Sequence, residues 1–151
     1  MIIKKITIGT IMKINLDRFL TAQKQDYPIA LQEIKEDVKQ SHWMWYIFPQ
    51  VKGLGQSDIA KFYAIQSKAE ACEYLNNDVL NNNLIEITEV LLGLVETDAT
   101  KIFGHIDTLK LQSSMTLFAC LSNENSIFHK VLEKYFNGKM DTFTQVFLKN
   151  E

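Results

Sequence analysis

The residues best suited to chemistry lie in the segment KQSHWMWYIFPQ, which begins at Lys39. Six of its side chains in a row are large and apolar or aromatic, so the run has no polar face in either a helix or a strand. A buried Trp or Tyr needs a partner for its N–H or O–H, and a core that required only volume would use Leu and Ile. Aromatic runs of this kind more often belong to a core, and the alternative is a pocket wall in which Trp43 and Trp45 face a planar or cationic ligand. In such a pocket Lys39 is the anion partner and His42 the proton donor or acceptor, whereas in a core anchor the polar flanks cap a helix end.

A second polar group lies further along the chain, where Asp107, Lys110 and Ser114 stand at spacings of three and four. Those spacings place all three side chains on one stripe of a helix. The opposite, core-facing stripe carries Leu111 and Met115. The serine and threonine hydroxyl groups in this segment give no advantage in helix propensity, which indicates that they form hydrogen bonds. The alternative is a solvated helix face with a local Asp–Lys pair that contributes only roughly 0.3 kcal/mol.

The turn GLGQS, which ends at Ser57, precedes a predicted helix. Free backbone N–H groups at a helix N-terminus attract anions, so Ser57 and the nearby Gln50 are candidate ligand-binding residues. The turn matches neither a phosphate-loop nor a dinucleotide fingerprint, and a plain turn with a serine cap is the simpler interpretation.

The sequence lacks the motifs of several classes of site. It contains no HExxH motif, no His/Cys ligand set, no GxSxG elbow and no calcium-loop spacing, so we predict neither a metal ion nor a cofactor. The 16 basic and 18 acidic residues give a net charge of -2, and Arg18 is the only arginine, which argues against a nucleic-acid-binding surface. Cys72 and Cys120 have no disulfide or CxxC spacing, and we expect both to be reduced and buried in a cytoplasmic protein.

These side chains need helices to position them, and apolar spacings of three and four along most of the chain predict an all-α fold. Polar residues that can cap a helix N-terminus divide the chain into about eight short helices, which we expect to form a single compact domain. We expect Asn15 or Asp17 to open the first helix, and Asp26 with Pro28 to open a second one whose buried stripe includes Val38. The helix starts expected further along the chain are Ser57, Ser67, Asp78, Asp98, Asp107, Ser126 and Asp141.

Residues 1–12 form a predicted N-terminal extension to a helical domain over residues 13–151. The extension has lysines before a short apolar stretch. That stretch is interrupted by threonine and glycine, and it is far shorter than the roughly 20 residues that span a bilayer. We therefore expect no export signal, no membrane insertion and a cytoplasmic protein.

Several motifs of the chain are specific enough to compare with known families. They are DRF with Gln23, KxxHWMW through FPQ, GLG with Ser57, and FG, Asp107, Lys110 and SSMTLF. On these residues, the chain from about residue 16 to residue 148 resembles an uncharacterised bacterial family, domain of unknown function 1810, whose members are sometimes mislabelled calpastatin. It departs from that family at Asp37 and Val38, where members often have Gly-Arg, so one positive charge is missing. The resemblance implies an all-helical fold and brings no established activity with it.

Together these motifs predict a small-molecule pocket that suits a nucleotide-like ligand, because indole rings stack on bases and lysines and helix N-termini bind phosphate. His42 and Asp107 are the candidate catalytic pair for acid–base chemistry, and the boldest version is a hydrolase of an N-glycosidic or ADP-ribose-type bond. The candidate ligand-binding residues are Lys39, Trp43, Trp45, Gln50, Ser57, Lys110 and Ser114. The competing hypothesis is a non-catalytic module that binds a partner protein through exposed aromatic residues.

Overall fold

The computed structural model describes residues 14–151 and contains eight helices over that range. They are α2 (Asp17–Lys35), α3 (Met44–Ile47), α4 (Asp58–Tyr63), α5 (Lys68–Asn76), α6 (Asp78–Gly93), α7 (Ala99–Cys120), α8 (Ile127–Phe136) and α9 (Thr142–Lys149). No strand forms among these residues, although an isolated parallel β-bridge pairs Val51 with Ile65. The prediction of an all-α, single compact domain with about eight helices is confirmed. The predicted N-terminal extension, residues 1–12, lies outside the described residues.

Polar side chains begin most of the helices, as the sequence predicts. Each cap accepts a hydrogen bond from a backbone N–H two or three residues later, which satisfies one of the unpaired donors of a helix N-terminus. The caps are Ser57, Ser67, Asn77, Asp98, Ser126 and Asp141. Five of the predicted caps are therefore confirmed. The cap expected at Asp78 is wrong by one residue, because Asn77 caps α6, and the helix start expected at Asp107 is wrong, because Asp107 lies inside α7, three residues after the turn at Gly104.

Helix α2 is longer than the sequence predicts, because it runs through Pro28 without a break. Proline at this point removes the hydrogen bond to the carbonyl of Lys24, but both residues lie on the exposed face of the helix, where water can satisfy that carbonyl. The expected helix start at Asp26 is therefore wrong. The expected burial of Val38 is also wrong, since α2 ends at Lys35 and Val38 is 38% exposed.

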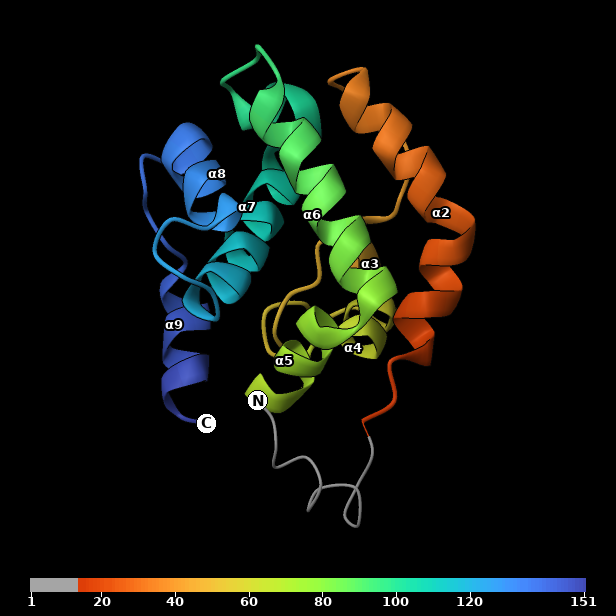
Figure 1. The fold of residues 1–151 in the computed structure, drawn as a ribbon, viewed down its shortest axis with the longest axis vertical. Helices are drawn as coiled ribbons and strands as arrows, with labels where there is room; N and C mark the ends of the chain where they lie inside the picture. The colour runs from red at the N-terminus through yellow and green to blue at the C-terminus, as the bar shows by residue number, and fades with distance from the viewer. Residues whose placement is uncertain (1–13) are drawn as a thin grey trace.

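Helix α6 lies between α2 and α8 and contacts both (Figure 1). Helix α7 packs against α8 and α9, and the short α3 packs against α2 and α4. The apolar faces of these helices share one core, which includes the fully buried rings of Trp43, Phe48 and Phe118. The aromatic run thus belongs to the core, with the exception of Trp45, which is half-buried. No helix within residues 14–151 has both the length and the apolar character needed to cross a bilayer.

A buried glutamine connects four of the helices. The Gln23 amide on α2 donates to the Tyr46 carbonyl on α3 and to the Tyr74 hydroxyl on α5, both at 2.8 Å. Its carbonyl accepts a hydrogen bond from Asn83 on α6 at 2.9 Å. Gln23 is only 2% exposed, so water does not compete for these bonds. The network fixes α3, and with it Trp45, relative to α2.

The two cysteines are free thiols, but they are less buried than the sequence predicts. Cys72 is half-buried, and Cys120 is exposed. Cys120 is the last residue of α7, one position beyond the core-facing Ala119, which explains why its side chain points outward. The expected burial of both cysteines is therefore wrong.

Candidate functional site

Five of the nine predicted site residues line one open hollow at the surface. The hollow has a volume of about 480 Å³ and lies between the segment that follows α2, the start of α3 and the N-terminal part of α7. We call it the lysine hollow. Its lining residues are Lys39, His42, Met44, Trp45, Phe103, Gly104, His105, Ile106, Asp107 and Lys110.

Two lysines share one carboxylate in the lysine hollow. The Nζ atom of Lys39 lies 2.9 Å from Oδ2 of Asp107, and the Nζ atom of Lys110 lies 3.6 Å from Oδ1 of the same side chain. The side chain of Lys39 is 7% exposed, that of Asp107 20% and that of Lys110 24%. Two positive charges against one negative charge leave this cluster with a positive excess, which its partial burial shields from screening by water and salt.

Both ammonium groups also lie over indole rings. The Nζ atom of Lys39 is 4.9 Å from the centre of the Trp43 ring, and that of Lys110 is 5.0 Å from the centre of the Trp45 ring. Attraction between a cation and an aromatic face favours this placement. The two rings differ in access, because Trp43 is 1% exposed whereas Trp45 is half-buried and lines the hollow. Trp45 is therefore the indole that a ligand can reach.

A buried carboxylate holds the loop that follows α2. Glu33 accepts hydrogen bonds from the backbone N–H groups of Gln40 and Ser41 at 2.8 and 2.9 Å, and from the Ser41 hydroxyl at 2.5 Å. It also accepts a hydrogen bond from the Trp43 indole at 2.8 Å. Burial raises the pKa of Glu33, but the hydrogen bonds from Ser41, Gln40 and Trp43 outweigh burial and lower the pKa to about 2. Glu33 therefore stays ionised and fixes the loop in place.

Further hydrogen bonds position Lys39 within that loop. Its backbone N–H donates to the carbonyl of Ile102 at 2.7 Å, which ties the loop to α7. Its ammonium group donates to the Ser41 carbonyl at 2.5 Å and pairs with Asp107. Lys39 and His42 thus reach the same hollow from a loop rather than from one face of a helix.

A break in α7 shapes the opposite wall of the hollow. Gly104 has φ 81° and ψ 167°, a backbone conformation that is essentially restricted to glycine. The chain turns at this residue and then resumes the helix that carries Asp107 and Lys110. His105 and Ile106 directly follow the break, are exposed and line the hollow.

The predicted catalytic pair, His42 and Asp107, faces the same hollow without a direct bond. Among residues 14–151 no hydrogen bond joins the two side chains, and the Asp107 carboxylate is occupied by two lysines. His42 is exposed, and a second imidazole, that of His105, lines the hollow with it. No group of three His, Cys, Asp or Glu side chains in the described part of the chain is placed to hold a metal ion.

The other four predicted site residues lie outside the lysine hollow. Trp43 is buried, and Ser57 is exposed at the start of α4, which it caps. Gln50 lines a separate and much smaller space of about 10 Å³. Ser114 is fully buried, because the helical stripe that begins at Asp107 enters the core two turns later.

Sequence reasoning missed Glu33, Gly104 and His105. A signal for Glu33 was available, since it lies three residues after Ala30 and beside Ile34 on the buried stripe of α2. A charged residue on such a stripe requires specific partners. His105 gave no comparable signal, because its place in the hollow depends on the backbone turn at Gly104.

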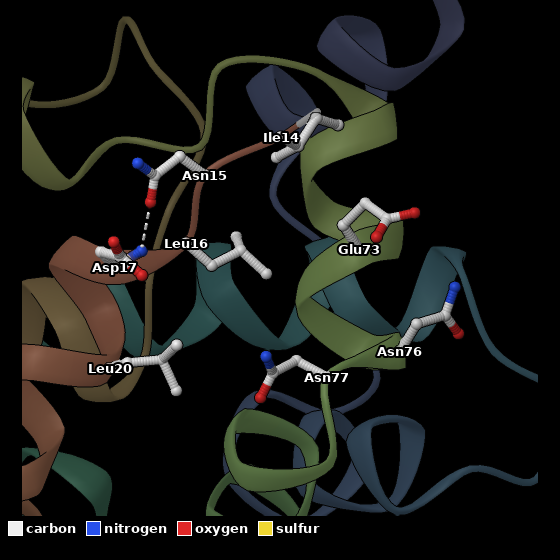
Figure 2. A pocket seen from close by; sticks show the side chains of 8 residues that line it. All are labelled: Ile14, Asn15, Leu16, Asp17, Leu20, Glu73, Asn76 and Asn77. Carbon is white, nitrogen blue, oxygen red and sulfur yellow. Dashed lines mark hydrogen bonds between the residues drawn. The ribbon is translucent and has the colours of Figure 1, made fainter. Parts of the chain in front are cut away.

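A larger hollow, of about 570 Å³, lies at the N-terminal end of α2 (Figure 2). Figure 2 shows the apolar and polar side chains of residues 14–17 and 20 on one side of this hollow and those of Glu73, Asn76 and Asn77 on the other. Its described lining residues are Ile14, Asn15, Leu16, Asp17, Leu20, Glu73, Asn76 and Asn77. None of these is cationic or aromatic, so the described lining of this hollow lacks the positive charge and the stacking surface of the lysine hollow.

Comparison with known proteins places these features in a wider group. A family model described as "Protein of unknown function (DUF1810)" matches residues 13–148. The chain is also similar to the conserved hypothetical protein Rv1873 from Mycobacterium tuberculosis, whose crystal structure superposes with a TM-score of 0.86 at 41% sequence identity. That match covers 89% of this chain and 96% of the mycobacterial one. No curated protein matches the chain.

Proposed function

This chain belongs to the family described as protein of unknown function (DUF1810), and we propose that its lysine hollow binds a small anionic, nucleotide-like molecule. The observation that carries the proposal is the excess of positive charge, since Lys39 and Lys110 share the single carboxylate of Asp107. A carboxylate or phosphate group that enters the hollow would neutralise this excess. Such a group would also meet the imidazole groups of His42 and His105, which line the same walls.

The two lysines differ in their capacity to bind a ligand. An ammonium group has three N–H donors. Those of Lys39 are engaged by the Ser41 carbonyl, by Asp107 and by the face of Trp43. Lys110 has only the 3.6 Å contact with Asp107 and the ring of Trp45. Lys110 is therefore the lysine that we assign to the ligand, and Lys39 orients Asp107.

The planar part of the ligand is assigned to Trp45. This ring lines the hollow, and its neighbour Lys110 can hold a phosphate close to it. Stacking on an indole contributes roughly 1–3 kcal/mol per base in single-stranded nucleic-acid complexes, which sets the scale for a nucleoside group here. An anion without a planar group should therefore bind more weakly than a nucleotide.

A thermal-shift titration of the full chain with AMP, adenosine and inorganic phosphate at constant ionic strength tests this proposal. A ligand at about 100 times its Kd stabilises a fold by about 2.7 kcal/mol, or roughly 5–10 °C for a domain of this size. We expect AMP to give the largest shift, because it uses both the charge and the ring. Equal shifts with all three compounds, or none with AMP, would contradict the proposal.

Variants separate the contribution of the Lys110 charge from that of the Trp45 ring. Lys110→Ala should abolish most of the AMP shift, whereas Lys101→Ala should keep it, because Lys101 is exposed on the same helix and lies outside the hollow. Trp45→Leu should lower the response to AMP and leave the response to phosphate unchanged. An AMP shift in Lys110→Ala that equals that of the wild type would rule out the hollow as the binding site.

The enzymatic form of the proposal assigns proton transfer to His42, with Asp107 holding Lys110, which binds the anion. The reaction to test is hydrolysis of the N-glycosidic bond of AMP, followed by chromatographic detection of free adenine. His42→Ala should slow it by roughly 100-fold or more, the usual contribution of general acid–base catalysis, while the AMP thermal shift persists. An unchanged rate, or no adenine from the wild type, would leave a binding site without this chemistry.

A protein-interaction module is the second candidate function, favoured by two exposed apolar side chains near the lysine hollow. Ile106 is 68% exposed and Leu109 is 52% exposed on α7. Exposed apolar groups in one place are typical of surfaces that contact other proteins. The variant Leu109→Lys should keep the AMP response under the leading proposal, because Leu109 does not line the lysine hollow, and it should remove partner binding under this one.

A further inference from the structure

A third hollow lies between α2, α3 and α4 and shares no lining residue with the lysine hollow. It has a volume of about 570 Å³, and the residues that matter for its chemistry are Arg18, Asp26, Tyr46, Phe62 and Tyr63. We call it the tyrosine hollow. It includes part of the DRF motif, which the lysine hollow does not use.

The arginine of the tyrosine hollow has no terminal donor left for an anion. Its NH1 nitrogen donates to the Asn15 carbonyl and to Glu70, and its NH2 nitrogen donates to the Ala64 carbonyl and to the other oxygen of Glu70. The remaining Nε atom is buried and has no access to the hollow. The bidentate pairing with Glu70 also cancels the charge of Arg18, so this hollow is not an anion site.

Two carboxylates without a basic partner among residues 14–151 line the tyrosine hollow, and of these, Asp17 and Asp26, the one hydrogen-bonded to an aromatic side chain is that of Asp26. One of its oxygens accepts a hydrogen bond from the Tyr46 hydroxyl, and no residue within 14–151 donates to the other. Burial raises the pKa of Tyr63, and the negative charge of Asp26 raises it further against the opposing effect of Arg18. Because Arg18 is paired with Glu70 whereas Asp17 and Asp26 have no basic partner in the described part of the chain, the lining of the hollow carries net negative charge.

Aromatic rings surround the Asp26 carboxylate on two sides. The rings of Tyr46 and Tyr63 have centroids 4.9 Å apart with an interplanar angle of 50°, and those of Phe62 and Tyr63 are 4.8 Å apart at 84°. The rings thus present faces in different directions. Phe62 is 60% exposed, so a ligand that enters the hollow can reach its ring.

We propose that the tyrosine hollow binds the ammonium group of an organic amine. A carboxylate neutralises the charge of such a group, and aromatic faces attract it through their quadrupoles, which is the arrangement that proteins use for alkylammonium ligands. The ammonium group can come from a free amine or from a lysine side chain of another protein. The two sources share the chemistry of the charged end, and they differ in the group to which that end is attached.

Titration of the ¹⁵N-labelled full chain with butylammonium and tetramethylammonium chloride tests the proposal, with sodium chloride as the ionic control. The expected result is a saturable shift of the amide signals of residues 26, 46, 62 and 63 with the amines only. Spermidine and Nα-acetyl-lysine methylamide distinguish the sources, since tighter binding of spermidine indicates a free amine and equal or tighter binding of the lysine derivative indicates a protein side chain. Equal shifts with sodium chloride or with sodium acetate would overturn the proposal.

Matched variants separate the contribution of the Asp26 charge from that of the Phe62 ring. Asp26→Asn removes the charge and keeps an acceptor for the Tyr46 hydroxyl, and it should weaken butylammonium binding about tenfold. Phe62→Leu should weaken it about threefold, because it removes one aromatic face from an exposed position. Phe143→Leu, at another exposed ring on α9, should leave it unchanged. Wild-type affinity in folded Asp26→Asn would refute the role of this hollow.

Discussion

Replacing Glu33 by glutamine tests how the chain builds the lysine hollow. Glutamine keeps the length and one carbonyl acceptor of the side chain, but it removes the charge. It also brings an NH₂ group to a site where four donors converge, from Gln40, Ser41 and Trp43. We therefore expect Glu33→Gln to destabilise the fold and to loosen the loop that carries Lys39.

The magnitude follows from the pKa of Glu33, which lies at about 2 in the folded chain against an ordinary value of 4.5. A lowered folded pKa means that the ionised carboxylate stabilises the fold above pH 4.5, and that this stabilisation is lost as the pH falls toward 2. At about 1.4 kcal/mol per pKa unit, the full contribution at pH 7 is about 3 kcal/mol. At pH 3 the same relation predicts that about 1 kcal/mol of this stabilisation remains.

Urea denaturation at pH 7 and at pH 3, followed by tryptophan fluorescence, measures both values. The difference in unfolding free energy between wild type and Glu33→Gln should fall by about 2 kcal/mol from pH 7 to pH 3, while effects of other carboxylates cancel in the comparison. Glu36→Gln, an exposed position directly after α2, should change stability by less than about 0.5 kcal/mol at both pH values. A difference for Glu33→Gln that does not change with pH would refute the role of its charge.

Two further substitutions probe the elements that position the site. Gln23→Leu should lower the free energy of unfolding, measured by urea denaturation, by about 2–4 kcal/mol. The substitution leaves the Tyr46 carbonyl, the Tyr74 hydroxyl and Asn83 without their buried partner. Gln25→Leu, on the exposed face of the same helix, should be nearly neutral. Gly104→Ala should cost about 1–3 kcal/mol although no atom lies within 4 Å of the new methyl group, because the backbone conformation at φ 81° excludes a side chain. Gly93→Ala, which also has open space but no positive φ, should be neutral or stabilising by up to about 1 kcal/mol, so equal melting temperatures for the two alanine variants would contradict the argument.

The local features of the fold could be predicted from the sequence because they depend on near neighbours. A cap such as Ser126 or Asp141 interacts with a backbone N–H three residues later, and both partners are fixed by spacing alone. The burial of the aromatic run followed from composition in the same way. Pro28 shows the limit of such rules, since its effect on a helix depends on whether the unpaired carbonyl faces water.

The candidate site was only partly predictable, because it depends on contacts between distant segments. Helical spacing correctly paired Asp107 with Lys110, yet the same spacing placed Ser114 beside them, and the packing of α7 buries it. The contact of Lys39 with Asp107 joins the loop after α2 to α7, two segments that are far apart in the sequence. No local pattern encodes such a contact. The contact depends on the hydrogen bond from the Lys39 backbone N–H to the Ile102 carbonyl and on the hydrogen bonds by which Glu33 holds the loop.

The motif residues divide according to how much of their bonding capacity the protein itself uses. Gln23 and Glu33 are buried, and their hydrogen bonds are made within the chain, so their role is to position other groups. Lys39 belongs with them, because each of its donors already has a partner. Lys110 and His42 retain capacity toward the lysine hollow, so substitution there should affect ligand binding or turnover more than folding. Lys39→Ala should do the reverse, since it leaves Asp107 in a partly buried site with only its long contact to Lys110.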